Sequence, residues 1–410
     1  MSPHHGQRLL LFASTTGYQI RVFADAARRM GVELTLATDR CHVMEDPWGD
    51  RAIAVKFDRV AESVEVLRGR RFDGVAAVGD RPAVLAAAAA EALGLPFHPL
   101  AAARACHDKH AARQLYRAAG LRVPEFFRAS LDDDPAVAAR RATYPCVLKP
   151  LGLSASRGVI RANNQAEFQA AFRRIRALLG DSGEPFLQVE DYIPGREFAV
   201  EGLVTRGELQ PLAIFDKPDP LEGPYFEETI YVTPSREPEA VQRDLLETAA
   251  AAVGALGLRH GPVHAELRYN DAGAWMLEAA ARPIGGLCAR TLRFRGNLPL
   301  EELILCHALG EDVSAARVEG PASGVMMIPI PKAGIYHGVA GVERALAVED
   351  IEDVTITAQD GDRLVPLPEG SSYLGFLFAR GQTPDAVEAA LRKSHAELRF
   401  DVATVLETVR

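Results

Sequence analysis

Cysteine is scarce and scattered in this chain of 410 residues. The cysteines are odd in number, lie far apart and include no Cys-x-x-Cys pair. This spacing indicates neither a disulfide framework nor a zinc site, and it favours a reducing compartment. The five cysteines are Cys41, Cys106, Cys146, Cys288 and Cys306.

The sequence also lacks a long uncharged apolar run. Its longest largely apolar stretch, residues 83–95, contains Glu91 and is too short to span a bilayer. Residues 1–15 show no apolar core followed by a cleavage site. We therefore expect a cytoplasmic protein without a membrane segment, and we interpret His4 and His5 as part of a disordered terminus.

Basic residues are outnumbered by acidic ones, and the net charge is −9. This balance argues against nucleic acid as a partner, although a local basic pocket for one nucleotide is compatible with it. An apolar fraction of 48% over 410 residues supplies enough material for a large core and for roughly two to four domains.

The first region of the chain alternates short apolar strands with helices, which is typical of βαβ units. Its first strand-to-helix turn, residues 14–19, lacks the Gly-x-Gly-x-x-Gly spacing of a dinucleotide site, so no cofactor is assigned to it. Strands are expected at 8–12, at 32–38 and within 72–80, with helices over 17–31 and after residue 80.

The pattern changes twice further along the chain. A helix is expected over residues 106–120, followed by a long series of strands and hairpins to about residue 280. After a looser stretch, a third region is expected to contain strands near 324–330 and 374–379 and a final helix around 384–398.

A lysine and a small-residue hairpin lie next to each other in the middle region. Lys149 ends a short apolar strand, and residues 152–158 follow with glycine, serine and alanine. Free backbone N–H groups beside an ammonium suit a phosphate chain. No Walker motif is present, and the next element is a strand rather than a helix. The pattern predicts a flexible phosphate lid, with an ordinary glycine-bearing surface hairpin as the alternative.

Residues 186–204 are expected to form a strand, a Pro-Gly turn and a second strand, with Glu190, Asp191 and Glu197 around the turn. A strand edge exposed at a hinge offers one N–H and one C=O to an adenine ring, and Glu197 can accept ribose hydroxyls. A solvated hairpin with acidic residues explains the same pattern.

Two further acids lie on neighbouring strands joined by the turn at residues 270–273. Glu266 on the first strand and Glu278 on the second would repel across the hairpin unless a divalent cation lay between them. Magnesium suits carboxylates together with phosphate oxygens. Strand alternation aims His264, Glu266 and Arg268 to one face. His264 fits either a buried structural histidine or a ligand.

The order of these features resembles that of the ATP-grasp superfamily along most of the chain. The order is a lysine on a helix (Lys109), a lysine on a strand, a small-residue hairpin, an acidic hinge, and two acids followed by an arginine. The resemblance implies a fold that combines α/β and α+β parts. These are an N-terminal βαβ (pre-ATP-grasp) domain over 1–105, an ATP-grasp domain over 106–315 with a mobile lid at about 145–215, and a C-terminal closing subdomain over 316–410.

The resemblance also implies the cofactors ATP and Mg²⁺, with Mn²⁺ as a substitute for Mg²⁺. It carries over the metal ligands Glu266 and Glu278 and the following nucleotide-binding residues: Lys109, Lys149, Ser154, Ser156, Gly158, Glu190, Asp191, Tyr192, Ile193 and Glu197.

The segment MLEAAARPIGG, residues 276–286, departs from the common pattern. Many members carry an asparagine as a further magnesium ligand where this chain has Ala280. This version, with Gly285 and Gly286 following Arg282, resembles the branch that includes bacterial L-amino-acid ligases, which make dipeptides. Residues 215–235 and 370–391 resemble that branch as well.

The implied reaction is activation of a carboxylate. The carboxylate attacks the γ-phosphate of ATP, and an amine then displaces phosphate from the acyl phosphate. The implied partners are small molecules, a carboxylate and an amine, and a homodimer is left open. Arg282 and Lys149 are the catalytic candidates. The substrate candidates are Arg282, Gly285, Gly286, His264 and Glu228, with Lys217, Tyr225 and Glu227 as further candidates.

Two alternatives remain open from the sequence. One is a different ATP-grasp ligase, which acts on a purine precursor or carboxylates a substrate with bicarbonate. The other is a nucleotide-binding protein without turnover, which the loss of the asparagine makes conceivable.

Overall fold

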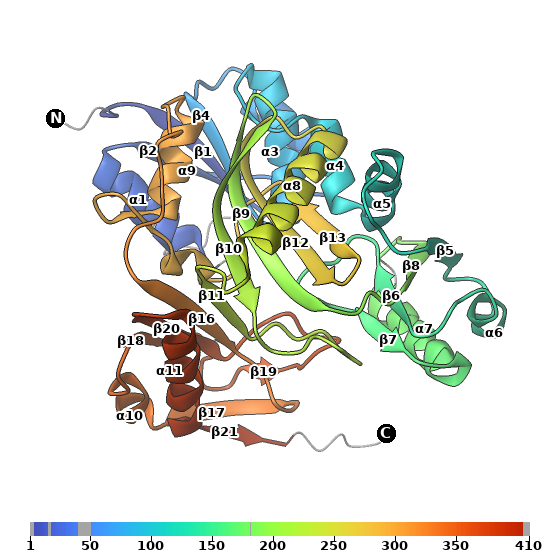
Figure 1. The fold of residues 1–410 in the computed structure, drawn as a ribbon. Helices are drawn as coiled ribbons and strands as arrows, with labels where there is room; N and C mark the ends of the chain where they lie inside the picture. Colours follow the sequence, from blue (N-terminus) through green and yellow to red (C-terminus); the bar gives the residue numbers. More distant parts are fainter. Residues whose placement is uncertain (1–3, 15–17, 40–50, 181, 405–410) are drawn as a thin grey trace.

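A computed structural model describes residues 4–14, 18–39, 51–180 and 182–404 (Figure 1). Cys41, part of the 14–19 turn and the first residue of the expected 17–31 helix lie outside the described residues. Within the described ranges the remaining cysteines are free, and every helix is too short or too polar to cross a membrane.

The N-terminal region forms a parallel sheet in the order β3-β2-β1-β4. The chain leaves β1 and β4 into α1 and α3, so the carboxyl ends of these paired strands border one crevice. The elements are β1 (Arg8–Ala13), α1 (Ile20–Met30), β2 (Glu33–Thr38), β3 (Ala52–Ala54), α2 (Val60–Leu67), β4 (Gly74–Val78), α3 (Asp80–Leu93) and α4 (Leu100–His107).

A second, antiparallel sheet has the order β5-β8-β6-β7 and projects to one side of the molecule (Figure 1). Helix α7 covers it with Phe168, Phe172 and Ile175, all of them buried. We call this sheet and its helices the lid. The elements here are α5 (Lys109–Ala118), β5 (Phe126–Ser130), α6 (Pro135–Ala139), β6 (Cys146–Pro150), β7 (Ile160–Ala162), α7 (Gln165–Leu179) and β8 (Phe186–Asp191).

The single helix expected over 106–120 is wrong, because the chain forms two helices there, α4 and α5. Asp108 lies between them in an extended conformation, and its side chain accepts hydrogen bonds from the N–H groups of His110 and Ala111. Aspartate at such a cap position begins a new helix. Lys109 is therefore the first residue of α5 rather than a mid-helix residue.

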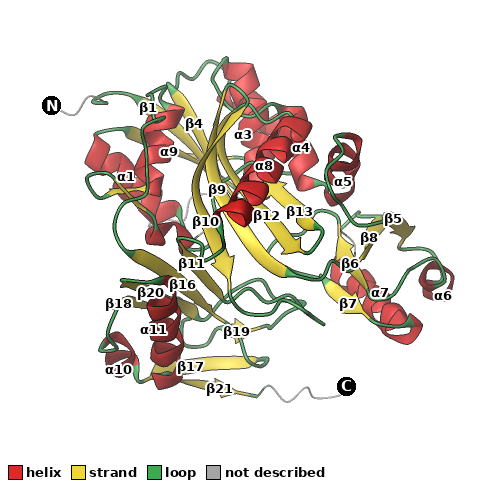
Figure 2. Ribbon diagram, in the orientation of Figure 1, coloured by secondary structure: helices red, strands yellow, loops and turns green. Residues whose placement is uncertain are grey.

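The largest sheet runs in the order β13-β12-β9-β10-β11-β16-β20-β18, with antiparallel neighbours throughout. Figure 2 shows α8 lying across β9, β10, β12 and β13. The elements are β9 (Arg196–Thr205), β10 (Glu208–Lys217), β11 (Ile230–Thr233), α8 (Glu239–Leu256), β12 (His260–Asn270), β13 (Gly273–Ala280), α9 (Leu300–Ala308), β16 (Ala322–Ile328), α10 (Val342–Leu346), β18 (Ile351–Ile356), β20 (Gly375–Gly381) and α11 (Pro384–Glu397).

The third region continues this sheet through β16, β20 and β18, and it forms a separate small sheet in the order β19-β17-β21. Ile230 of β11 pairs with Met326 of β16, so the strands on the two sides of residue 316 share one hydrogen-bonded sheet. The expected strands near 324–330 and 374–379 and the final helix are present. The strands of the small sheet are β17 (Gly334–Ala340), β19 (Arg363–Leu364) and β21 (Arg399–Ala403). Before residue 316 the chain also forms a short helix (Cys288–Thr291), β14 (Arg293–Phe294) and β15 (Leu298–Pro299).

The two strands expected within residues 186–204 are present as β8 and β9, but the alternative interpretation, a solvated hairpin, is wrong. β8 pairs with β5 and β6 in the lid, whereas β9 pairs with β10 and β12 in the large sheet. The intervening Gly195 has φ +122°, and a Cβ there would lie 2.3 Å from the Tyr269 carbonyl oxygen. The segment is therefore a connection between two sheets, which a pattern of strand, turn and strand cannot distinguish from a hairpin.

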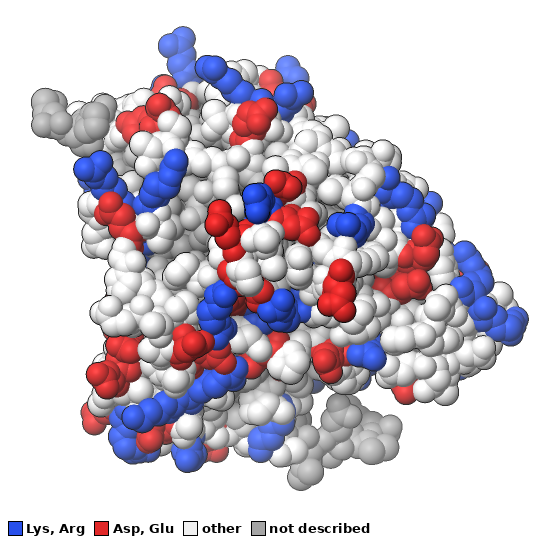
Figure 3. Space-filling view, viewed as in Figure 1, with Lys and Arg blue, Asp and Glu red and all other residues white. Residues whose placement is uncertain are grey.

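His4 does not belong to a disordered terminus. It is buried and takes part in a turn in which the Gln7 N–H donates to the His4 carbonyl oxygen at 3.0 Å. At the surface, Figure 3 shows basic and acidic side chains interspersed over the face drawn.

Candidate active site

A cavity of about 320 Å³ lies where the N-terminal sheet, the lid and the large sheet meet. Asp80 reaches it from the start of α3, Lys149 from the lid, and Glu266 from the large sheet. Except for Gly158, every site residue predicted from the sequence lines this cavity. Of the further candidates, Lys217, Tyr225 and Glu227 are not among the lining residues.

On the lid side, two cations share one buried carboxylate. Glu190 is 3% exposed, with Oε1 2.6 Å from Arg113 Nε and Oε2 2.6 Å from Lys149 Nζ. Burial alone would raise the pKa of Glu190, but Arg113 and Lys149 outweigh it and lower the pKa to about 2. Burial lowers the pKa of Lys149, and Glu190 opposes that shift. Glu190 thus serves as the counter-ion of the lysine and not as an open hinge group.

The small-residue hairpin joins β6 to β7 and lines the cavity with Ser154 and Ser156. Ala155 and Ser156 have φ of 55° and 54°, a conformation that short side chains tolerate best. Gly158 does not line the cavity. Its N–H donates to the Pro368 carbonyl oxygen at 2.8 Å, and a Cβ there would lie 2.7 Å from Pro150. Gly158 is therefore needed for packing, and its N–H is not free for phosphate.

A loop of the C-terminal region holds this hairpin. Besides the Gly158 contact, Arg157 Nε donates to the Glu369 carbonyl oxygen at 2.8 Å. Arg174 of α7 forms an ion pair with the Glu369 carboxylate and donates to the Tyr225 hydroxyl. Ser371 and Tyr373, in the same loop as Glu369, line the cavity. We call residues 365–373 the latch loop.

The connection between the two sheets borders the cavity through Asp191, Tyr192 and Ile193. The Asp191 N–H donates to the Glu125 carbonyl oxygen at 2.9 Å, and the Tyr192 N–H donates to that of Pro145 at 3.0 Å. The carbonyl oxygen of Ile193 accepts from Arg268 at 2.6 Å. These three backbone groups are engaged within the protein, so an adenine edge would meet other backbone groups of the segment.

On the side of the large sheet, Lys217 lies among three carboxylates. Its Nζ lies 2.8 Å from Glu197 and 3.4 Å from Glu266, and it contacts Glu228 directly. Oxygens of these three acids lie within 4.8 Å of one another. Glu197, the predicted ribose acid, also accepts from Arg268 Nε at 2.9 Å.

This crowding separates the pKa values of the neighbouring acids. Burial, together with the negative Glu266 and Glu197, raises the pKa of Glu228 to about 7, although Lys217 opposes the shift. Burial would also raise the pKa of Glu266, but Lys217 and His264 lower it well below its usual range. Two carboxylates in contact with the same ammonium therefore differ in their readiness to accept a proton.

His264 and Glu201 position the segment that follows β13. His264 Nδ1 lies 3.0 Å from Glu201 Oε2, and the Ile284 N–H donates to Glu201 at 3.1 Å. Burial would lower the pKa of His264, but its bonds to Glu201 and Glu266 raise it to about 9. His264 is thus a buried, paired histidine whose ring also borders the cavity.

Glu266 and Glu278 are direct partners across the β12–β13 hairpin, as the alternation predicted. The side chain of Glu278 is 34% exposed and lies 3.6 Å from Lys109 Nζ. Ala280 pairs with His264 on the same two strands and is buried. Two adjacent carboxylates at a cavity are a suitable oxygen donor pair for a divalent cation, and the Ala280 methyl group adds no ligand.

Arg282 reaches from the large sheet to the N-terminal region. Its Nε lies 2.9 Å from Asp80 Oδ1, and Nη1 donates to the Pro283 carbonyl oxygen at 3.0 Å. Gly286, with φ +59°, leaves no room for a side chain, since a Cβ would lie 2.9 Å from Phe376. Gly285 has open space where a Cβ would be.

Among the residues not singled out from the sequence are Asp80, which lines the cavity, and Arg113 and Glu201, which contact lining residues. Each carried a local signal. Asp80 follows the carboxyl end of a buried parallel strand, Arg113 lies one helical turn after Lys109, and Glu201 is a lone acid within an apolar strand.

Three family models match consecutive parts of the chain. Residues 24–97 match an ATP-grasp N-terminal domain, residues 142–291 an ATP-grasp domain, and residues 326–403 the L-amino acid ligase C-terminal domain 2. The fold and the site define an ATP-grasp protein, and the chain belongs to the ATP-grasp superfamily. Its C-terminal region is similar to that of L-amino acid ligases.

Individual relatives and a solved structure are similar to this chain. The alanine–anticapsin ligase of Bacillus subtilis is 30% identical over 224 residues, 48% of this chain and 46% of that protein. Protein y4rH of Sinorhizobium fredii is 21% identical over 302 residues, 73% of this chain and 62% of that protein. The chain thus spans about half the length of the curated relatives it matches. The L-amino acid ligase structure from Bacillus licheniformis has a TM-score of 0.84 at 25% identity, covering 98% of this chain and 100% of that chain.

Proposed function

We propose that this protein is an ATP-dependent ligase that forms an amide bond between the carboxylate of an amino acid and an amine. The reaction would pass through an acyl phosphate and release ADP and phosphate. The observation that carries the proposal is a single cavity bordered by Lys109, Lys149, Glu266, Glu278 and Arg282. These groups supply cations for a phosphate chain, adjacent acids for a divalent cation and a guanidinium for a carboxylate or acyl phosphate.

Lys109 and Lys149 would contact the phosphates of ATP. Glu266 and Glu278 would hold Mg²⁺, for which Mn²⁺ is an expected substitute, and the ion would supply neutralising charge on the transferring phosphoryl group. The acyl phosphate would lie near Arg282, whose planar fork can donate two parallel hydrogen bonds. The amine would face the acidic group around Lys217, where Glu228 accepts a proton most readily.

Water must be kept from the acyl phosphate for amide formation to succeed. The 152–158 hairpin, as part of the lid, would cover the phosphates. Its contacts with the latch loop support this role, because that loop also lines the cavity through Ser371 and Tyr373. Closure of the lid would therefore also complete the wall of the substrate pocket.

The test is a phosphate-release screen over pairs of amino acids with Mg-ATP, followed by product analysis. We expect ADP, phosphate and an amide in equal amounts, with release dependent on both amino acids. AMP and pyrophosphate would contradict the proposal, as would turnover that requires bicarbonate or a purine precursor. Nucleotide binding without turnover for any pair would favour a non-catalytic protein.

The remaining expectations concern the assembly and its location. We propose that the partners are these small molecules and that the location is cytoplasmic. Light scattering of the purified chain would decide whether it forms a homodimer.

A further inference from the structure

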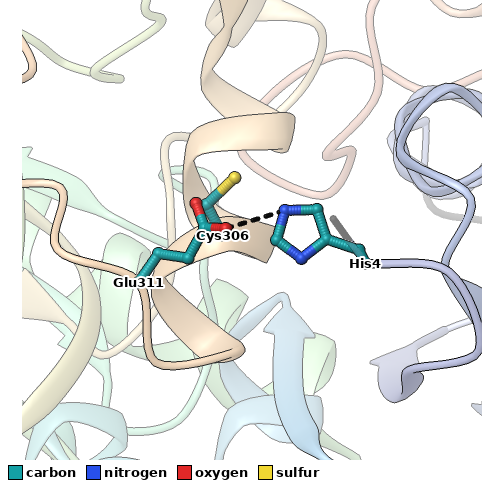
Figure 4. A group of neighbouring side chains, drawn as sticks. All are labelled: His4, Cys306 and Glu311. Carbon is teal, nitrogen blue, oxygen red and sulfur yellow. Dashed lines mark ion pairs between the residues drawn. The ribbon is translucent and has the colours of Figure 1, made fainter. Parts of the chain in front are cut away.

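A second group of metal-binding side chains lies where the N-terminal turn meets α9. His4 Nε2, Cys306 Sγ and a carboxylate oxygen of Glu311 lie within 4.8 Å of one another, and Figure 4 shows all three directed toward a common point. None of the three lines the active-site cavity. The cluster is therefore separate from the ligase site and does not depend on the proposed function.

The end of α9 fixes two of the three donors. Gly310 has φ +87°, the Glu311 N–H donates to the Cys306 carbonyl oxygen at 3.0 Å, and the Gly310 N–H donates to that of His307 at 3.0 Å. This pair of bonds is a Schellman cap, which brings the side chain after the glycine back beside the last helical turn. Apolar side chains usually meet there, but in this chain a thiol and a carboxylate do.

The third donor lies in a turn that is itself anchored. The Glu33 N–H of β2 donates to the Gln7 carbonyl oxygen at 2.9 Å, which ties the turn to the N-terminal sheet. The His4 residue is 7% exposed, its Nδ1 lies 2.8 Å from Gln7 Oε1, and its Nε2 lies 2.9 Å from Glu311 Oε1. The Glu311 carboxylate accepts only, so Nε2 carries a proton that must leave before this nitrogen binds a metal. The Gln7 carbonyl oxygen accepts only as well, so Nδ1 donates to it and orients the ring. Metal-bound histidines are commonly oriented by such a bond.

We propose that His4, Cys306 and Glu311 bind one Zn²⁺ ion, with water in the fourth position. Zinc accepts imidazole nitrogen, thiolate sulfur and carboxylate oxygen in a tetrahedron with bonds of about 2.0–2.3 Å, which places neighbouring donors roughly 3.5 Å apart. The present spacing requires only a small contraction, together with opening of the His4–Glu311 contact. The bound ion would join the N-terminal turn to the end of α9, and these two segments lie far apart in the sequence.

The proton balance of binding involves both the thiol and the imidazole. Burial, with Glu311 adding to it, raises the pKa of Cys306 to about 12, so the metal-free thiol keeps its proton. Binding forms a zinc–thiolate bond and a zinc–imidazole bond, and it releases the thiol proton and the Nε2 proton of His4 to solvent.

The test uses Co²⁺ as a spectroscopic probe on the full chain after removal of metals. Excess Mg²⁺ is present, because it occupies oxygen-rich sites and binds thiolates poorly. We expect one cobalt ion per chain with a cobalt–thiolate charge-transfer band, which added Zn²⁺ removes by displacement. Cys306→Ser should abolish the band, and Gln7→Ala, which keeps all three donors, should weaken cobalt binding by about tenfold.

Matched variants separate a built site from adventitious binding. His4→Ala should lose the band, whereas His5→Ala, at the exposed neighbouring position, should bind as the wild type does. Glu311→Gln provides a second ligand variant should Cys306→Ser fold poorly. A band that survives Cys306→Ser, or equal cobalt affinity in the His4 and His5 variants, would overturn the proposal.

Discussion

The two sides of the active-site cavity arrange their charges in opposite ways. On the lid side, Arg113 and Lys149 share the single carboxylate of Glu190. On the side of the large sheet, the four carboxylates of Glu197, Glu201, Glu228 and Glu266 share three cationic side chains, which are Lys217, Arg268 and His264. A site with cations to spare suits a polyanion such as a phosphate chain, and a site with carboxylates to spare suits an amine or a metal ion. The two substrates of a ligase need both kinds of surface at one cavity.

Glu278 lies between the two sides, so its replacement should give the largest effect. Glu278→Gln removes one of the two adjacent carboxylates without changing the size of the side chain. We expect phosphate release to fall by about 100-fold or more. Mg²⁺ would be held less firmly, and this ion supplies the charge that neutralises the transferring phosphoryl group. The measurement is phosphate release at saturating ATP over a range of Mg²⁺ concentrations.

The control for this prediction is Glu239→Gln, an exposed acid at the start of α8. It should release phosphate at the wild-type rate. Full activity of the Glu278 variant at all Mg²⁺ concentrations would reject the metal site.

Replacing Arg282 tests whether the acyl phosphate is stabilised at the boundary between the two sides of the cavity. Arg282→Lys keeps the charge but loses the planar fork that now holds Asp80. We expect turnover to fall by about tenfold while ATP affinity stays near the wild-type value, since the interaction strengthens only as the reaction proceeds. Steady-state kinetics and nucleotide titration would measure the two quantities separately, and an equal loss in both would assign Arg282 to ATP binding instead.

The pH dependence should separate the two sides. Glu190, with its pKa lowered to about 2, is a carboxylate throughout the working range, whereas Glu228, with its pKa raised to about 7, gains its charge as pH rises through neutrality. We therefore expect the KM for the amine substrate to fall between roughly pH 6 and pH 8. Glu228→Gln should flatten this change, and the KM for ATP should show no corresponding step. A step that survives in the Glu228 variant would belong to another group or to the amine itself.

The sequence predicted which residues line the cavity and the fold class, but it did not predict how the strands around the cavity pair. The resemblance of the residue order to the ATP-grasp superfamily predicted that Lys149, Glu266 and Glu278 meet at one cavity, and strand alternation predicted that Glu266 faces Glu278. They could not show that β8 and β9 separate into two sheets, or that Asp80 crosses to Arg282, since these pairings depend on contacts between distant segments. Gly158 illustrates the same limit, because its partner Pro368 lies in another region of the chain.

The smallest expected effect concerns the latch loop and tests whether the lid side depends on the C-terminal region. Glu369→Gln weakens the ion pair with Arg174. An exposed ion pair contributes about 0.2–1 kcal/mol, so the equilibrium constant for lid closure should fall by up to about fivefold. Water would then compete better for the acyl phosphate, so phosphate should exceed amide while ATP consumption changes little.

Glu397→Gln is the matched control. It breaks a pair with Arg344 of similar exposure, 65% and 39% against 44% and 38%, in the same region but away from the cavity. If both variants keep phosphate and amide equal, the latch loop does not control the lid. If both lose the balance equally, the effect belongs to the stability of the C-terminal region and not to closure over the phosphates.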